Sequence, residues 1–176
     1  AERLFHLRGY DGAGVAELSK ATGVNPPSLY GAFGSKAGLF ARALDHYGDT
    51  QGGFVAEALE AADPARALLR AAARLYAPTN GRAGCLAIET ARGASDPEAR
   101  AEAATRLTET RRLILERLAR EPRMAADAEA AADALVVALV GLSGLARLGW
   151  SEGRLDRAAA ALADGFEARF SAAGAG

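Results

Sequence analysis

The chain has 176 residues, a formal net charge of −1 and a composition that is 50% hydrophobic but only 6% aromatic. This charge excludes a general attraction to nucleic acid or to an acidic membrane, so any contact with DNA has to come from locally placed charge. The single cysteine excludes an internal disulfide and a multi-cysteine zinc site, and is typical of the reducing cytoplasm. The abundant alanine favours helices that pack closely through small side chains.

The first elements in the chain are two short helices. The segment AERLF starts abruptly in helical sequence, so we expect further residues to precede it. The first helix is predicted to end at Gly9, and a loop, YDGAG, follows. Residues 15–22 then place apolar side chains at helical spacing, and Gly23 ends this second helix.

The stretch GVNPPSLYGAFGSK, at residues 23–36, predicts a third helix and the start of a fourth. Asn25 can cap a helix whose first turn holds two prolines, since the N–H groups of that turn have no partner to lose. Gly34 ends this helix, and Ser35 can cap the next. A helix so short has little stability of its own. We therefore expect its exposed face to have a use.

Longer helices are predicted beyond a glycine-rich break, GDTQGG, at residues 48–53. They are expected at residues 64–76, 84–92, 98–120, 126–149 and 155–170. Asp63 and Asp96, each followed by proline, are predicted to begin the first and third of these helices. No strand alternation or internal repeat is visible. The sequence therefore predicts an all-α protein with a small N-terminal unit at residues 1–47 and a larger helical unit at residues 54–176.

The most apolar run, residues 134–146, bears on membrane association. It is shorter than the roughly 20 residues that a transmembrane helix needs. We therefore expect a helix buried in protein and no membrane partner. Because the helix from Ala125 to Trp150 is apolar on nearly every side, we also expect part of it to pack against a second copy of the chain.

Residues 15–22 and 26–33, joined by a turn at Gly23, form a helix-turn-helix. Its inward-facing residues are expected to be Val15, Leu18, Val24 and Leu29. The second helix of such a motif enters the major groove of DNA. The residues available on its surface are Asn25, Pro27, Ser28, Tyr30, Gly31 and Ala32. Ser35 and Lys36 begin the next helix, where free N–H groups, the helix dipole and an ammonium together favour a phosphate.

Two other classes compete with a DNA-binding protein. Short helices that meet at a glycine are also ordinary parts of helical bundles, which leaves a ligand-binding or interaction protein without DNA contact as the alternative. Residues 1–50 hold as many acidic as basic side chains, so charge does not decide between a DNA-binding protein and this alternative. An enzyme is not indicated, because no cluster of titratable groups is visible. Cys85 is read as a buried packing residue, while His6 and His46 lack metal-ligand spacing, so no metal or cofactor is expected.

The run from AERLF through GY to VAELSKATGVNPPSLYGAFGSKAGLF closely resembles the DNA-binding head of the TetR family of transcriptional regulators. The shared features include the LF…GY of the first helix, the Gly-Val turn, the Ser-Leu-Tyr of the third helix and the Phe-Gly-Ser-Lys that starts the fourth. The GCL at residues 84–86 also resembles many relatives. Two features depart from the family. Ala13 and Gly14 stand where relatives usually carry Thr or Ser, and the first helix is truncated.

The resemblance implies a one-component regulator, a repressor, that binds double-stranded operator DNA as a homodimer in the cytoplasm and is released by a small apolar or aromatic effector. The remaining helices fit the family's ligand-binding and dimerisation domain in number and order, and residues 48–53 would be the hinge. Candidate pocket residues, which the sequence alone does not separate from ordinary core residues, are Phe54, Tyr76, Leu86, Arg147 and Trp150. Candidate dimer-interface residues are Leu142, Leu145, Leu162, Phe166 and Phe170.

Overall fold

The computed structural model describes residues 1–170, and the regular secondary structure of this part of the chain is helical, as the sequence predicts. It contains no strand, and an isolated bridge joins Thr79 to Arg82. The elements are α1 (Glu2–Gly12), α2 (Val15–Thr22), α3 (Pro26–Phe33), α4 (Lys36–Tyr47), a π-helical turn η1 (Gly48–Gly52), α5 (Phe54–Leu59), α6 (Pro64–Tyr76), α7 (Leu86–Gly93), α8 (Pro97–Ala119), a 3-10 turn η2 (Ala125–Asp127), α9 (Ala128–Arg147) and α10 (Glu152–Phe170).

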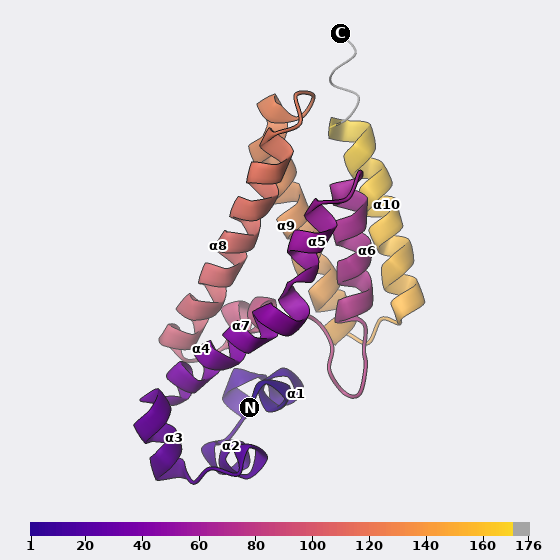
Figure 1. Ribbon diagram of the computed structural model, residues 1–176. Coiled ribbons are helices and arrows are strands. Elements are labelled where there is room, and N and C mark those ends of the chain that lie inside the picture. Colours follow the sequence, from indigo (N-terminus) through magenta and orange to yellow (C-terminus); the bar gives the residue numbers. More distant parts are fainter. Residues whose placement is uncertain (171–176) are drawn as a thin grey trace.

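The helices form a small head and a longer body (Figure 1). α1 to α3 and the start of α4 make the head at one end, while α6, α8, α9 and α10 run along the body. Within the body, α10 packs along α6 and α9, and α8 packs along α7 and α9. The head is joined to the body where α1 meets α7 and where α4 meets α8.

Polar caps begin four of these helices, at the positions that the sequence predicts. Asn25, Asp63 and Asp96 each accept a hydrogen bond from a backbone N–H of the following turn, and each is followed by proline in the first turn of its helix. The Ser35 hydroxyl accepts from the N–H of Gly38 at 2.9 Å and caps α4. Local chemistry therefore fixes where α3, α4, α6 and α8 start.

Two segments that were predicted to be loops are helical. Gly9 has φ +70° and kinks the first helix, but a further turn follows up to Gly12 where the loop was expected, and the Ala13 N–H bonds back to this turn. The glycine-rich segment at 48–53 is not a break either. Residues Gly48–Gly52 form a π-helical turn between α4 and α5, and the Thr50 hydroxyl donates to the carbonyl of His46 at 2.7 Å.

The apolar helix predicted from Ala125 to Trp150 is shorter, because Gly149, with φ +86°, follows its last turn. Together with η2 it still spans 23 residues with a hydropathy of 1.7, which by length and composition is enough to cross a membrane. The apolar stretch is longer than the 13 residues at 134–146 that the sequence analysis considered, because flanking alanines extend it. One side of α9 packs against α6, α8 and α10, and a core helix of a helical bundle passes the same test.

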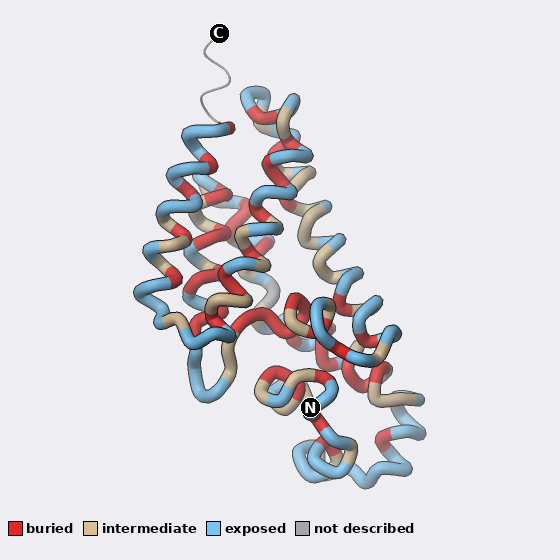
Figure 2. The backbone as a smooth tube through the Cα atoms, turned by 180° about the vertical axis from the view of Figure 1, so that it is seen from behind, coloured by how far each residue is buried: buried red, intermediate tan, exposed pale blue. Residues whose placement is uncertain are grey.

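Buried side chains concentrate in the body and at its junction with the head (Figure 2). In the head, Phe5 and Tyr10 pack edge-to-face against Phe40, with ring centroids 5.1 and 5.3 Å away from that of Phe40. The helix-turn-helix contributes Leu18 and Leu29 to this core. Val24 was expected to face inward, but it lies in the turn between α2 and α3 and is exposed.

Candidate nucleic-acid interface and cavity

α3 presents nearly all of its side chains to solvent. Leu29 is its one fully buried residue and anchors the helix to the head. The residues singled out in the sequence are all exposed here: Asn25, Pro27, Ser28, Tyr30, Gly31 and Ala32. Tyr30 is 44% exposed, which is unusual for a large ring. The face that these residues form, called here the α3 face, is covered by no other part of residues 1–170.

Gly38 holds α3 against α4, and sequence reasoning missed it. A Cβ at this position would lie 2.0 Å from the carbonyl oxygen of Phe33, far closer than atoms can approach. The chain reverses between the two helices at Gly34, which has φ +73°. The available signal was a glycine inside the first turn of a capped helix. Glycine lowers helix stability there, so its presence indicates that close packing excludes a larger residue.

Lys36 lies at the N-terminus of α4, where the sequence predicts it. Its Nζ is 4.5 Å from the centre of the Tyr10 ring. The Tyr10 hydroxyl in turn donates to Asp96 at 2.6 Å, and this bond is the main cause that lowers the pKa of that carboxyl group. Lys36 is thus a half-buried cation held over an aromatic face beside free helical N–H groups. Ser35, its neighbour, serves as the cap of α4.

Four further cations of the head were counted in the sequence but given no role in DNA contact. Arg8 pairs with Glu17 at 3.5 Å, and Arg42 pairs with an aspartate. Lys20 on α2 and Arg3 on α1 are exposed and have no ion pair among residues 1–170. With Lys36, which also lacks an ion pair among these residues, a near-neutral head therefore carries three unpaired positive side chains, and Lys20 belongs to the helix-turn-helix itself.

A partly open cavity of about 160 Å³ lies in the body, below the head. Predicted residues Phe54 and Tyr76 line it, with their rings edge-to-face and their centroids 6.2 Å apart. Its wall comes from α4, η1, α5, α6, α8, α9 and the segment that starts α7. Further lining residues include Leu44, Tyr47, Val55, Cys85, Ile88, Leu107, Thr110 and Leu139.

Three predicted pocket residues do not line this cavity. The Leu86 side chain is buried and borders a different hollow, between α1 and α7. Arg147 turns toward the head, where its Nη1 donates to the carbonyl of His6 at 3.4 Å. Trp150 follows the end of α9 and carries the Arg154 guanidinium 3.5 Å from the centre of its ring. Periodicity along α9 does not reveal that its last turn faces the head.

The tyrosine and cysteine side chains that line the cavity are neutral, and its charged lining residues, Arg106 and Glu109, are ion-paired. Burial raises the pKa of Tyr47, of Tyr76 and of the Cys85 thiol, so all three stay protonated near neutral pH. Arg106 pairs with Asp45 and with a glutamate of its own helix. The cavity thus offers an apolar wall with a few hydroxyl and thiol groups.

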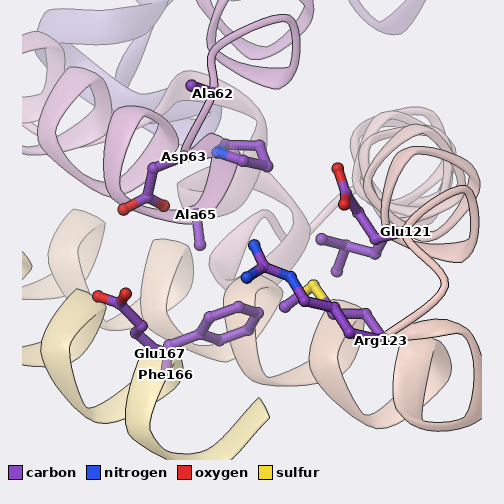
Figure 3. Close-up of a pocket in the computed structure, with 10 residues that line it drawn as sticks. Ala62, Asp63, Ala65, Glu121, Arg123, Phe166 and Glu167 are labelled. Atoms are coloured by element: carbon purple, nitrogen blue, oxygen red, sulfur yellow. The ribbon is translucent and has the colours of Figure 1, made fainter. Parts of the chain in front are cut away.

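A second cavity, of about 200 Å³, lies at the end of the body away from the head. Figure 3 shows the Arg123 guanidinium reaching into it, with Asp63, Glu121 and Glu167 around the rim. These charged groups are exposed or only half-buried. This cavity is more polar than the one beneath the head and shares no lining residue with it.

Apolar side chains on α9 and α10 remain open to solvent. Val137 and Leu148 are 70% and 78% exposed, and Leu162 on α10 is 44% exposed. Predicted interface residue Leu145 is half-buried beside them, whereas Leu142, at 1%, faces the core of its own chain and is not available to a partner. The name α9–α10 face is used here for exposed Val137, Gly141 and Leu148, half-buried Leu145, and Leu162 of α10.

Phe166 and Phe170 were also predicted at the interface. Both are 8% exposed, and their ring centroids lie 4.8 Å apart. They border a shallow hollow that also contains Leu162, so they support the α9–α10 face from below and are not open on it themselves. Their burial follows from the packing of α10 along α6.

An exposed helix-turn-helix on a helical body with a partly open cavity defines a DNA-binding regulator. Residues 1–43 match the family described as bacterial regulatory proteins, tetR family. The chain is 39% identical over 155 residues to the HTH-type transcriptional repressor BdcR of Escherichia coli (strain K12). The aligned residues cover 86% of this chain and 77% of BdcR. The chain therefore belongs to the TetR family. It is a transcriptional regulator and not an enzyme.

Other relatives agree with this assignment. The HTH-type transcriptional repressor ComR of the same E. coli strain is 45% identical over 49 residues, 28% of this chain and 23% of ComR. The TetR family regulator CifR, solved as a cysteine mutant with a 26-bp double-strand operator DNA, is 32% identical, with a TM-score of 0.83 over 93% of this chain and 92% of CifR. A putative TetR regulator from Rhodococcus sp. RHA1 is 30% identical, with a TM-score of 0.60 over 93% of both chains.

Proposed function

We propose that the protein is a repressor that binds operator DNA as a homodimer and is released by a small effector. The observation that carries this proposal is the α3 face: an exposed recognition helix, with Tyr30 at its centre, beside the Lys36 ammonium. Two relatives, BdcR and ComR, are named repressors, and CifR has been solved with an operator duplex. We propose the division that the sequence predicts, with residues 1–47 as the DNA-binding unit and residues 54–176 as the unit for effector and partner, while α4 of the first unit also lines the cavity.

Ser28, Tyr30 and Lys36 are the proposed direct contacts with DNA. The hydroxyls of Ser28 and Tyr30 reach phosphates or base edges, and the Lys36 ammonium reaches a phosphate. The small residues Gly31 and Ala32 let the helix backbone approach the groove closely. Asn25, Pro27 and Ser35 shape the two helix starts that face the DNA. Contacts of this kind explain how a protein of net charge −1 binds a polyanion in the cytoplasm.

The effector is proposed to bind in the cavity beneath the head. An engineered apolar cavity of about 150 Å³ in another protein takes up benzene. The present cavity, of about 160 Å³, therefore suits a small apolar or aromatic molecule with one or two polar atoms. Its neutral hydroxyl and thiol groups favour an uncharged ligand over an ion.

The α9–α10 face is proposed to pair with the same face of a second copy. Two-fold symmetry makes such an interface isologous, and the two helices of each chain then form a four-helix bundle. Exposed apolar patches of this kind mark interaction sites. Pairing of the bodies places two heads at a fixed separation, which a palindromic operator requires.

Selection of duplexes from a random-sequence pool tests the DNA-binding part of the proposal. The wild-type chain should enrich a palindromic sequence, called here the selected duplex, and fluorescence anisotropy should show affinity that falls steeply as salt rises. A thermal-shift screen of small aromatic compounds should then find one that stabilises the protein. A stabilising compound combined with a failure to enrich any sequence would favour a helical ligand-binding protein that does not bind DNA.

A further inference from the structure

His6 lies at the point where the head meets the wall of the cavity. It belongs to α1 and is 3% exposed. Its Nε2 is 2.9 Å from the carbonyl oxygen of Gly84, a bond that spans the gap between α1 and the segment before α7. A carbonyl only accepts hydrogen bonds, so Nε2 carries the proton and donates.

The His6 ring also touches a second wall of the cavity. It packs edge-to-face against Tyr47 of α4, with centroids 5.7 Å apart. Tyr47 and Cys85, the residue after Gly84, both line the cavity. His6 is therefore one residue away from the cavity on two sides, through a hydrogen bond on one and a ring contact on the other.

The segment at Gly84 and Cys85 has little freedom to move independently. Gly84 has φ +73°, and a Cβ there would lie 2.8 Å from the Ser143 hydroxyl and 3.0 Å from the Ser143 carbonyl oxygen, so no larger residue fits. The Cys85 N–H donates to the same hydroxyl at 2.8 Å, and Ser143 donates onward to Glu89 at 2.7 Å. This segment is thus fixed to α9 while it holds His6.

A contact from α9 completes a closed set of interactions. Arg147, one turn after Ser143, donates from Nη1 to the carbonyl oxygen of His6 at 3.4 Å. Both the side chain and the main chain of His6 are therefore bound by the same part of the body. α1 is therefore bound to the Gly84 segment and to α9 at the same residue.

We propose that His6 is the residue that couples occupancy of the cavity to the DNA-binding head. A ligand that presses on Tyr47 or Cys85 shifts the Gly84 carbonyl or the Tyr47 ring, and His6 transmits either shift to α1. Coupling is reciprocal, so DNA on the head must restrict the Gly84 segment in return. The inference rests on the proposed function, but it concerns one positioning residue within it.

Hydrogen exchange tests this coupling without a known effector. Addition of the selected duplex should slow amide exchange over residues 84–90 of the wild-type protein by about fivefold or more, the lower range of ordinary allosteric coupling. His6→Gln keeps a side-chain N–H at the reach of Nε2 and should retain this protection. His6→Leu removes the donor and should lose it while α3 is still protected. His46→Leu, which removes an exposed histidine of the same head, is the matched control.

Ser143→Ala provides a second variant that leaves His6 in place but releases the Cys85 N–H, and it should also weaken the response of residues 84–90. If His6→Leu does not fold, the exchange of residues 84–90 in Ser143→Ala tests the coupling instead. Full protection of residues 84–90 in both variants would overturn the proposal, as would an absence of protection in a wild-type chain that binds the duplex. Failure of the wild-type chain to bind any duplex would instead overturn the proposed function.

Discussion

His6 is a buried base whose surroundings oppose its protonation. Burial is the main cause that lowers the pKa of His6 below its ordinary value of 6.5, and the charges of Arg82 and Arg147 act in the same direction. The hydrogen bond to the Gly84 carbonyl and the charge of Glu2 oppose them. In the folded protein His6 is thus neutral near pH 7, as its role at the junction requires.

This shift makes stability depend on pH. The unfolded chain takes up a proton on His6 near pH 6.5 while the folded chain does not, so the free energy of unfolding falls as the pH drops from 6.5 toward the folded pKa. Above pH 6.5 the effect vanishes. We expect His6→Gln to remove this part of the acid destabilisation, and His46→Gln to retain it. Urea denaturation across the acid range measures both, and a wild-type-like acid profile in His6→Gln would contradict the assignment.

Lys36 makes the most specific prediction for DNA contact. Lys36→Ala should weaken binding about equally for all duplexes and reduce the slope of log affinity against log salt by about one, because one phosphate contact is lost. Arg120→Ala, at the far end of α8, is the control and should change neither quantity. Tyr30→Ala should cost more and reduce the preference for the selected duplex. An unchanged salt slope in Lys36→Ala would remove this residue from the interface.

At the scale of single helices, the approach of α3 to α4 depends on Gly38. Gly38→Ala should destabilise the head by about 1–3 kcal/mol, since overpacking against the Phe33 carbonyl forces the two helices apart. Gly31→Ala meets nothing within 4 Å and should stabilise α3 by up to about 1 kcal/mol. Its added methyl group on the α3 face should nevertheless weaken DNA binding. Thermal melts and anisotropy distinguish the two, and equal stability in both variants would refute the packing argument.

Helix starts could be predicted from the sequence because they are local. Asn25, Asp63 and Asp96 each cap a helix within a few residues of themselves, and proline follows each one. The turns after Gly9 and Gly48 could not, since glycine permits both a break and a distorted helix. Packing of α1 on α7 and the continuous run of α4 into α5 decide those cases.

The α3 face could also be predicted from the sequence, whereas most of the cavity could not. The exposure of Tyr30 follows from a short amphipathic helix and from the family motif. Cavity residues such as Tyr47, Cys85 and Thr110 come from elements far apart in the chain, so no local spacing groups them. Arg147 and Leu142 were misplaced for the same reason: which side of α9 faces the core, the head or solvent depends on its neighbours.

At the scale of the whole molecule, the α9–α10 face should hold two chains together. Val137→Glu and Leu162→Glu should each produce monomers, because an isologous interface places every substitution in it twice. Ala104→Glu, on the exposed side of α8, is the matched control and should leave the dimer intact. Sedimentation velocity measures the outcome, with circular dichroism to confirm folding. A wild-type chain that stays monomeric at all concentrations would contradict this interface.

The central claim is that one molecule carries two linked binding functions, for operator DNA through the α3 face and for an effector through the cavity beneath the head. Titration calorimetry with the selected duplex, with and without a saturating compound from the thermal-shift screen, tests it most directly. The compound should weaken DNA binding, and DNA should weaken compound binding by the same factor, of about fivefold or more. Tight binding of both ligands with no change in either affinity would contradict the account.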